Sequence, residues 1–231
     1  CGVFGISNAK DASALTALGL HALQHRGQEA GGIVAFDGED GRLHKGSGLV
    51  SEIFDPESLK GLRGNTAIGH VRYSTAGGSD PANIQPITAR YRLGELALAH
   101  NGNLTNQRAL RTSLVEDGAI FSSSSDSETL VHLMAKSRAK TVDDQVMDAL
   151  SHLVGAFSMA LVVRGKLYAA RDPRGFRPLI LGRKDNGHVV VSETCALDIL
   201  GATYLRDLEP GEVVRIESNE VHEIGRLDPA P

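Results

Sequence analysis

The chain opens with a short, mostly apolar run, GVFGIS at residues 2–7, and similar runs recur at 31–36, 67–73 and 95–100. Each run has the length of a strand and is bounded by glycine or polar residues, which is typical of buried strands. We therefore expect a strand at each of these four segments, the first beginning almost at residue 1.

Apolar residues spaced three and four apart predict helices in two parts of the chain. The first helix is expected to begin after an N-cap at Asp11 and to stop at Gly27, with an apolar stripe of Leu15, Leu18, Ala22 and Leu23. Farther on, Ser125 and Glu128 have the spacing of a capping box. They predict a helix through Leu130, Leu133 and Met134, followed by another that carries Val146, Met147, Leu150 and Leu153.

After Gly155 the pattern changes to short β-branched or apolar runs, most of them divided by Gly, Asp or Pro: AFSMALVV, KLYAA, RPLILG, HVVVS, EVVRIE and EVHEI. Many strands with few helices predict an α+β fold in which helices cover sheets. The last residues, GRLDPAP, have the composition of a linker. We expect one domain over residues 1–225 and the start of a linker over 226–231.

Composition and charge exclude several classes of partner. The 231 residues carry a net charge of −4 and are 41% hydrophobic, so we expect neither nucleic acid nor a membrane as partner, and no apolar run has the length of a membrane span. Two cysteines, Cys1 and Cys195, cannot form a disulfide framework of the secreted type, so we expect a reducing compartment, the cytoplasm. No cofactor and no metal are expected, because neither cysteine stands in a CxxC pair, and His21 and His25 have no acid or thiol beside them in the sequence.

Cys1 is the first candidate for chemistry. A cysteine at position one is, by itself, more often an accident of processing than a catalyst. A terminal amine, however, has an ordinary pKa of about 7.7–8.0, so much of it can be neutral near physiological pH. A thiol on the same residue then has a base within reach, directly or through one water.

Three other segments carry candidate groups. In GHVRYST (69–75), alternation places His70 and Arg72 on one strand face, and a polar loop follows at 75–86. An arginine there can pair with a carboxylate, although a surface arginine is the commoner case. In HNGNLTN (100–106), Asn101 and Gly102 form either a tight turn or an oxyanion hole. Asp126 in SSDSE stabilises a helix start or binds a substrate ammonium group.

Two further segments are given structural roles. The run RDPRGFRPL at 171–179 is expected to hold an ion-pair network. Cys195, which lies among Ala, Leu and Ile, is expected to be a buried and inert thiol.

Taken together and in this order, CGVFGI, HRGQEAGGI, GHVRYST, HNGNLTN and SDSE resemble the glutaminase domain of the class II glutamine amidotransferases, which are N-terminal-nucleophile hydrolases. HRGQEAGGI, RDPRGFRPL and SETCALD resemble the branch of this family that supplies ammonia to a phosphoribosyltransferase domain in purine synthesis. The resemblance covers residues 1 to about 225. It implies a four-layer α/β/β/α sandwich and glutamine as substrate.

The resemblance also implies a role for each candidate residue. Cys1 attacks the glutamine carboxamide while its own amine serves as base and then as acid. The tetrahedral oxyanion is bound by Asn101 and Gly102. The residues expected to bind or support the substrate site are Arg72 for the α-carboxylate, Asp126 for the α-ammonium, Thr75 in the closing loop 73–86, and Arg26 beside Cys1.

Three functions remain open at this point. The chain is an active glutaminase, a catalytically silent module that needs its phosphoribosyltransferase domain, or another N-terminal-nucleophile amidase. Arg72 and Asp126 disfavour the last, because an amino-acid head group needs two opposite charges. The phosphoribosyltransferase domain itself is expected in the full enzyme and absent from this chain, and a homo-oligomer is possible.

Overall fold

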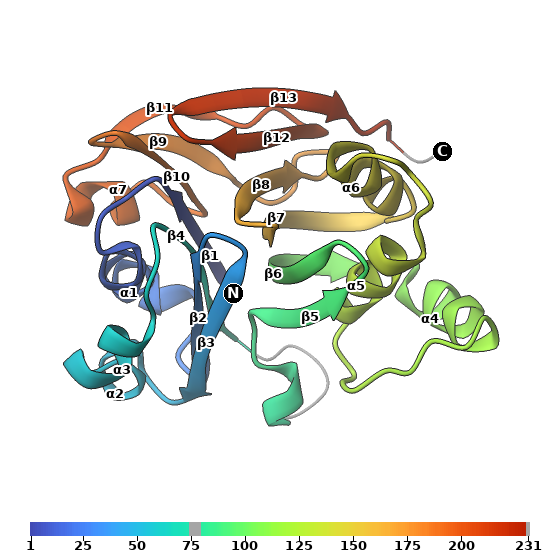
Figure 1. Ribbon diagram of the computed structural model, residues 1–231, viewed down its shortest axis with the longest axis horizontal. Helices are drawn as coiled ribbons and strands as arrows, with labels where there is room; N and C mark the ends of the chain where they lie inside the picture. The colour runs from blue at the N-terminus through green and yellow to red at the C-terminus, as the bar shows by residue number, and fades with distance from the viewer. Residues whose placement is uncertain (74–79, 230–231) are drawn as a thin grey trace.

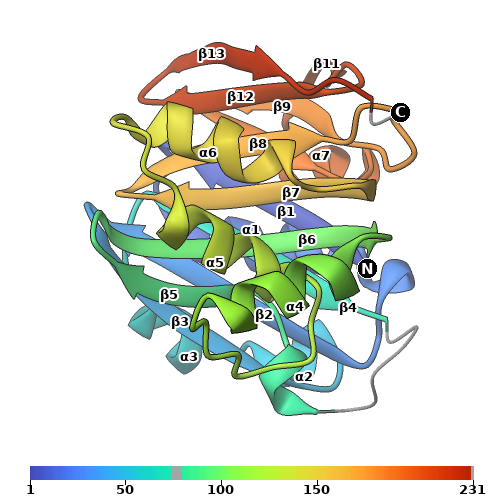
Figure 2. The same ribbon diagram turned by 90° about the vertical axis from the view of Figure 1, so that its right-hand side faces the viewer.

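A computed structural model describes residues 1–73 and 80–229 of the chain. Within these residues, two antiparallel sheets stack face to face, and helices cover the outer face of each sheet (Figures 1 and 2). This arrangement confirms the α+β class and the four-layer α/β/β/α sandwich expected from the sequence.

The first sheet has seven strands in the order β11-β9-β10-β1-β4-β2-β3. Its strands are β1 (Gly2–Ser7), β2 (Ala30–Asp37), β3 (Asp40–Ser47), β4 (Thr66–Arg72), β9 (Ile180–Lys184), β10 (Gly187–Val191) and β11 (Thr203–Asp207). Its outer side is covered by α1 (Ala12–Ala22), η1 (Gln24–Arg26), α2 (Val50–Ile53), α3 (Pro56–Gly61) and α7 (Cys195–Leu200) (Figure 1).

The second sheet has six strands in the order β13-β12-β8-β7-β6-β5. Its strands are β5 (Ile87–Tyr91), β6 (Gly94–Leu104), β7 (Gly155–Val163), β8 (Lys166–Arg171), β12 (Glu212–Glu217) and β13 (Glu220–Arg226). The helices α5 (Ser127–Lys136) and α6 (Val142–Ser151) lie on its outer face, and α4 (Gln107–Glu116) packs beside α5 (Figure 2). A short helix, η2 (Pro81–Asn83), precedes β5.

The alternation of side chains along each central strand produces three apolar layers. In β1, Val3 packs into the layer between the sheets, whereas Phe4 and Ile6 pack against the helices outside. All six residues of β1 are therefore buried, which explains why the strand reads as a continuous apolar run. The third layer lies between the second sheet and α5 and α6.

The four expected strands are confirmed as β1, β2, β4 and β6, with one change of consequence. β6 continues through the HNGNL segment to Leu104, so the Asn-Gly pair lies inside a strand and the tight-turn interpretation is wrong. The sequence did not predict β3 and β5, which are edge strands, because their outer positions are exposed and their apolar pattern is weak.

The helix at α1 is confirmed, and its predicted apolar stripe is wrong at Leu18 alone, because Leu23 is buried and Leu15 and Ala22 pack against the core. Leu18 is exposed, and the buried side of the helix consists of smaller residues and one leucine: Ala12, Ser13, Thr16, Ala17, Gly19 and Leu20. Asp11 occupies the N-cap position in a left-handed conformation, with a φ of 58°, and makes no side-chain cap bond. Small residues face the sheet because the helix lies very close to β1.

The predicted capping box at Ser125 and Glu128 is also wrong. The helix α5 begins at Ser127, with Asp126 as its N-cap. Glu128 reaches back to the backbone N–H groups of Ser122 and Ser123, both at 2.8 Å. The carboxylate therefore holds the serine-rich loop before the helix, while Leu130, Leu133 and Met134 are buried as expected.

The packed part of the chain extends past the last strand. After β13, Leu227 is buried and its N–H donates to the carbonyl of Gly211 at 2.8 Å, so the packed domain includes this residue. Among the described residues, no helix is long and apolar enough to cross a membrane.

Candidate active site

A small pocket of about 150 Å³ brings together residues from both sheets. Four of the predicted site residues line it, Cys1, Arg72, Gly102 and Asp126, whereas Asn101 and Arg26 do not. Cys1 precedes β1 and Arg72 ends β4, which pairs with β1, while Gly102 lies in β6 of the other sheet. The pocket thus forms where the ends of these strands meet across the sandwich.

Cys1 is fixed by two hydrogen bonds with Arg26. The terminal amine donates to the Arg26 carbonyl at 2.7 Å, and the Nε of Arg26 donates to the Cys1 carbonyl at 2.8 Å. The Sγ of Cys1 lies 3.6 Å from the carbonyl oxygen of Tyr73. The structure therefore places Arg26 beside Cys1, where the sequence expectation put it.

The environment of the Cys1 amine lowers its pKa to about 6. Burial contributes most, because it disfavours the charged form, and the positive charges of Arg26 and Arg177 act in the same direction. The negative charge of Glu29 opposes them. At neutral pH the amine is therefore largely neutral and able to accept a proton.

Asn101 and Gly102 lie side by side in β6, opposite Ser158 and Phe157 of β7. The Asn101 side chain is buried, and its Nδ2 has no hydrogen-bond partner among the described residues. A buried amide N–H without a partner is uncommon and costs free energy, so it calls for a ligand. Gly102 has a φ of +152°, a conformation that other residues rarely adopt.

His70 and Arg72 share one face of β4, as the alternation predicted, and both line the pocket. Only 8% of Arg72 is exposed, and one of its guanidinium nitrogens donates to the Asp80 carbonyl at 3.4 Å. His70 is fully buried, and its Nε2 donates to the His100 carbonyl at 3.1 Å. Burial is the main cause that lowers the pKa of His70 to about 3, so this ring is neutral.

Asp126 presents an ionised carboxylate to the pocket. One oxygen accepts from the N–H of Leu104 at 3.1 Å, and the other lies 3.5 Å from the Nδ1 of His100. Burial raises the pKa of Asp126, but hydrogen bonds, first that with His100, outweigh it and hold the pKa below its ordinary value. The pocket therefore holds a cation, Arg72, and an anion, Asp126.

The sequence interpretation missed the polar residues that hold the pocket walls. Asn83 and Ser124 are joined by hydrogen bonds of 2.9 and 3.1 Å. Gln85 accepts from the His100 N–H at 2.6 Å and donates to Ser127 at 3.2 Å. The only signal in the sequence was the density of Asn, Pro and Asp in the loop. Thr75, the predicted loop contact, lies outside the described residues, as do residues 74–79 in general.

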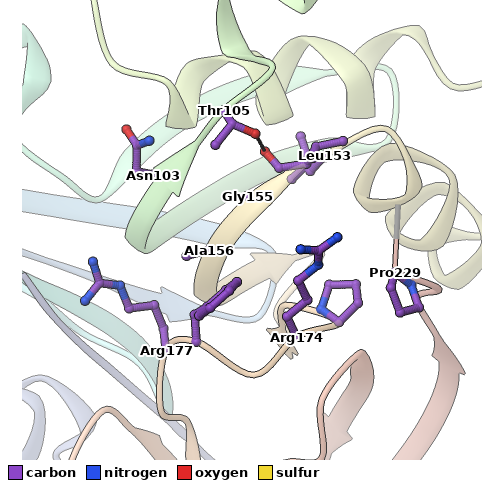
Figure 3. Close-up of a pocket in the computed structure, with 11 residues that line it drawn as sticks. Asn103, Thr105, Leu153, Gly155, Ala156, Arg174, Arg177 and Pro229 are labelled. Carbon is purple, nitrogen blue, oxygen red and sulfur yellow. Dashed lines mark hydrogen bonds between the residues drawn. The ribbon is translucent and has the colours of Figure 1, made fainter. Parts of the chain in front are cut away.

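A larger pocket of about 540 Å³ adjoins this site, and the two share Asn103 as a lining residue. Figure 3 shows Arg174 and Arg177 on one side of it and Thr105 and Leu153 on the other. Phe176, which also lines it, is 63% exposed. The pocket is thus an open, partly apolar surface with two guanidinium groups, of which that of Arg177 acts on the Cys1 amine.

The segment RDPRGFRPL forms a network of a different kind from the expected ion pairs. Asp172 is buried, and its carboxylate accepts backbone N–H groups, including those of Arg174 at 3.0 Å and Phe176 at 3.2 Å. Arg171 donates to backbone carbonyls, among them that of Leu208 at 2.6 Å. The charges in this segment therefore shape the loop through its backbone.

Cys195 is only partly buried, which corrects the expected buried thiol. Its Sγ, the Nε2 of His25 and the carboxylate of Glu193 lie within 4.8 Å of one another. His25 thus has an acid and a thiol beside it in space, although none adjoins it in the sequence. The same carboxylate is already bound to the guanidinium of Arg26, whose positive charge disfavours a cation there.

Comparisons with known proteins place the chain in one family. A family profile described as "Glutamine amidotransferase domain" matches residues 70–198. Amidophosphoribosyltransferase 3, chloroplastic, of Arabidopsis thaliana is 54% identical over 220 residues, which are 95% of this chain and 41% of the relative. Amidophosphoribosyltransferase of Bacillus subtilis (strain 168) is 50% identical over 217 residues, which are 94% of this chain and 46% of the relative.

A solved structure described as the allosteric regulatory enzyme of purine biosynthesis superposes with a TM-score of 0.93 at 47% identity. The match covers 97% of this chain and 49% of that one. It confirms the type of sandwich expected from the sequence. This chain spans less than half the length of each of these three proteins.

Proposed function

This chain belongs to the family of glutamine amidotransferase domains, and from that premise we propose that it hydrolyses glutamine to glutamate and ammonia through a γ-glutamyl thioester on Cys1. The observation that carries the proposal is the meeting of a nucleophile with two opposite charges in one pocket. A thiol with its own amine, a cation and an anion line a space of about 150 Å³. Gly102 lines it too, and the unpartnered buried amide of Asn101 directly precedes Gly102 in β6.

The Cys1 amine takes the proton from the Sγ, and the thiolate attacks the carboxamide carbon of glutamine. The oxyanion that forms is bound by the Asn101 side-chain amide and the N–H of Gly102. The ammonium of Cys1 then returns its proton to the leaving nitrogen, and ammonia departs. Water, deprotonated by the same amine, cleaves the thioester and releases glutamate.

The two ends of the substrate head group are assigned to opposite charges. Arg72 binds the α-carboxylate, since its planar fork matches a carboxylate with two parallel hydrogen bonds. Asp126 binds the α-ammonium, since its carboxylate is ionised across the working pH range. Thr75 and the segment 73–86 are proposed to close over the bound substrate.

The test is ammonia release from glutamine by this chain with Cys1 as its first residue, established by intact mass. Cys1→Ala is expected to keep its fold and to lose hydrolysis, and acid quenching of the parent chain is expected to trap a γ-glutamyl adduct on Cys1. Cys195→Ser is the matched control, because it removes the other thiol. Substantial ammonia release by Cys1→Ala would overturn the mechanism. A chain that is silent without a partner would support a glutamine-binding module instead.

We further propose that the ammonia serves a phosphoribosyltransferase domain, as in the amidophosphoribosyltransferases of purine biosynthesis. The identity of 50–54% to proteins more than twice the length of this chain supports this. The pocket that shares Asn103 with the Cys1 site is the surface through which ammonia would leave. A domain whose packed part extends to Leu227 rather than ending at 225, a linker that begins after it, and a cytoplasmic location belong to the same proposal.

A chimeric enzyme tests this second part. The chain is joined to the part of the Bacillus subtilis relative that it does not cover, and amine transfer to phosphoribosyl pyrophosphate is measured. The chimera is expected to use glutamine, whereas its Cys1→Ala form is expected to use free ammonia alone. A chimera that hydrolyses glutamine and accepts free ammonia, but never transfers glutamine nitrogen, would contradict the proposed partner.

A further inference from the structure

We infer that Glu193 is a positioning residue for Cys1, which it serves by holding the Arg26 guanidinium in place. The inference rests on the proposed function, since it concerns the residue that supplies both nucleophile and base. The sequence singled out SETCALD as a motif but assigned no role to its Glu193, which lies far along the chain from Cys1 and does not line the pocket.

Cys1 and Arg26 are joined by a reciprocal pair of hydrogen bonds. The Cys1 amine donates to the Arg26 carbonyl, and the Arg26 Nε donates to the Cys1 carbonyl. A chain terminus has no preceding peptide to hold it and is poorly ordered unless something fixes it. Two hydrogen bonds to one residue therefore set the position of both the amine and the backbone that carries the thiol.

Glu193 fixes the far side of the same guanidinium. One oxygen of its carboxylate accepts from the Nη1 of Arg26, and the other lies 2.9 Å from the Nε2 of His25. The side chains of Arg26 and Glu193 are 18% and 35% exposed, so the pair is shielded from solvent more than a surface pair is. Hydrogen bonds with Arg26 and His25 outweigh burial and hold the pKa of Glu193 below its ordinary value, so the carboxylate is charged.

The backbone around Glu193 is itself bound to β1, the strand that follows Cys1. The neighbouring Ser192 is fully buried and binds Val3 of β1 twice: its Oγ accepts from the Val3 N–H at 2.9 Å, and its own N–H donates to the Val3 carbonyl at 3.1 Å. The segment between β10 and α7 is thus fastened to β1 two residues from Cys1. Glu193 can therefore hold Arg26 at a fixed distance from the nucleophile.

The position of the Arg26 guanidinium also affects the pKa of the Cys1 amine. The charges that act on the Cys1 amine are those of Arg26 and Arg177, which lower its pKa, and of Glu29, which raises it. His70 faces the amine from β4 as a neutral ring. If Arg26 is released, its guanidinium turns toward solvent and one of the two positive charges leaves the amine. The pKa of the amine then moves up toward that of an ordinary chain terminus.

The experiment compares glutamine hydrolysis by the full chain and by Glu193→Ala over a range of pH. The variant is expected to lose kcat by on the order of tenfold to a hundredfold, since small displacements of a reacting group have effects of that size. KM for glutamine is expected to change by less than about twofold, because no substrate contact is removed. The acid limb of kcat/KM is expected to move to higher pH.

Two further variants separate positioning from a general loss of structure. Glu193→Asp keeps the charge. It is expected to recover part of the lost kcat and to show a smaller shift of the acid limb of kcat/KM. Glu39→Ala removes the carboxylate of another Arg–Glu pair, 3.0 Å from Arg164 and outside the site, and is expected to leave both unchanged. Thermal unfolding and titration of the Cys1 thiol count the folded, competent molecules in each sample.

The inference is overturned if the acid limb of Glu193→Ala does not move. It is also overturned if the limb moves to lower pH, which is the effect of simply removing a negative charge. A fall in activity that matches the fraction of unfolded protein overturns it as well. These results are distinguishable from failure of the proposed function, in which Cys1→Ala would hydrolyse glutamine as well as the parent chain does.

Discussion

The carbonyl oxygen of Ala156 lies 1.9 Å from the position that a Cβ atom would occupy at Gly102. Gly102 lies opposite Phe157 in the pairing of β6 with β7, and Ala156 directly precedes Phe157. No side chain fits at 102 while the strands keep this register, and the φ of +152° excludes most other residues as well. The glycine of the Asn-Gly pair is therefore required by the second sheet and by the site together.

Gly102→Ala is expected to displace β6 from β7 and to lower the free energy of unfolding by about 1–3 kcal/mol, as overpacking does in other cores. Glutamine hydrolysis is expected to fall further than this loss explains, because Asn101 moves with the strand. Gly61→Ala is the control, since a Cβ at that helical position meets no atom within 4 Å. Equal unfolding temperatures for the two variants would contradict the prediction.

The HNGN segment shows which features of the site could be predicted from the sequence and which could not. It indicated a polar pair after an apolar strand, and the resemblance gave that pair a role. It could not show that β6 continues through the motif, because an Asn-Gly pair is equally typical of a turn. The strand continues because β7 supplies partners as far as Leu104, and that pairing joins residues about fifty positions apart.

Asn101→Ala is expected to reduce kcat by about 10²–10³, the effect of removing one oxyanion-hole donor elsewhere. Its Nδ2 has no partner among the described residues, so the variant removes no stabilising hydrogen bond that the structure shows. Thermal unfolding should therefore change little. A variant that raises KM and keeps kcat would place Asn101 in substrate binding instead.

The α1 helix shows a second limit of sequence interpretation. Spacing correctly predicted a helix, but the largest apolar residues were assigned to the buried side, and Leu18 is 47% exposed. The side that packs on β1 has small residues because Gly19 lies against the ring of Phe4. How closely two elements approach is a property of the fold, which the pattern within one element does not contain. For the same reason, the buried Asn83 and Gln85 in the pocket wall were not predictable.

Gly19→Ala follows from this contact. A Cβ at Gly19 would lie 2.2 Å from a ring carbon of Phe4, which is fully buried and has no room to turn aside. The free energy of unfolding is expected to fall by about 1–3 kcal/mol, as measured by urea unfolding. Hydrolysis per folded molecule is expected to stay at the level of the parent chain, because α1 does not line the pocket.

The pH dependence of hydrolysis follows from the amine of Cys1. Its pKa of about 6 lies below the ordinary value of 8.0 for a chain terminus. The protonated amine cannot accept a proton, so kcat/KM is expected to be full above this value and to fall as pH drops through it. A rate profile between pH 5 and 9 measures the limb, and a limb near pH 8 would contradict the depressed pKa.

A chain that retains a methionine before Cys1 tests the same group by another route. Its Cys1 nitrogen becomes an amide, which is not a base. An amide N–H then replaces the terminal amine as the donor to the Arg26 carbonyl. Hydrolysis is expected to be lost at every pH, whereas glutamine binding, measured by calorimetry, is expected to weaken less. Normal turnover by the extended chain would refute the amine as base.

Arg72→Lys tests the assignment of the substrate carboxylate. A lysine keeps the positive charge but replaces the planar fork by a point charge, so the loss falls on binding. KM for glutamine is expected to rise by on the order of tenfold, which corresponds to about 1.4 kcal/mol, with a smaller change in kcat. Arg42→Lys, at an exposed position on the edge strand β3, is the matched control. An unchanged KM in Arg72→Lys would show that another group binds the carboxylate.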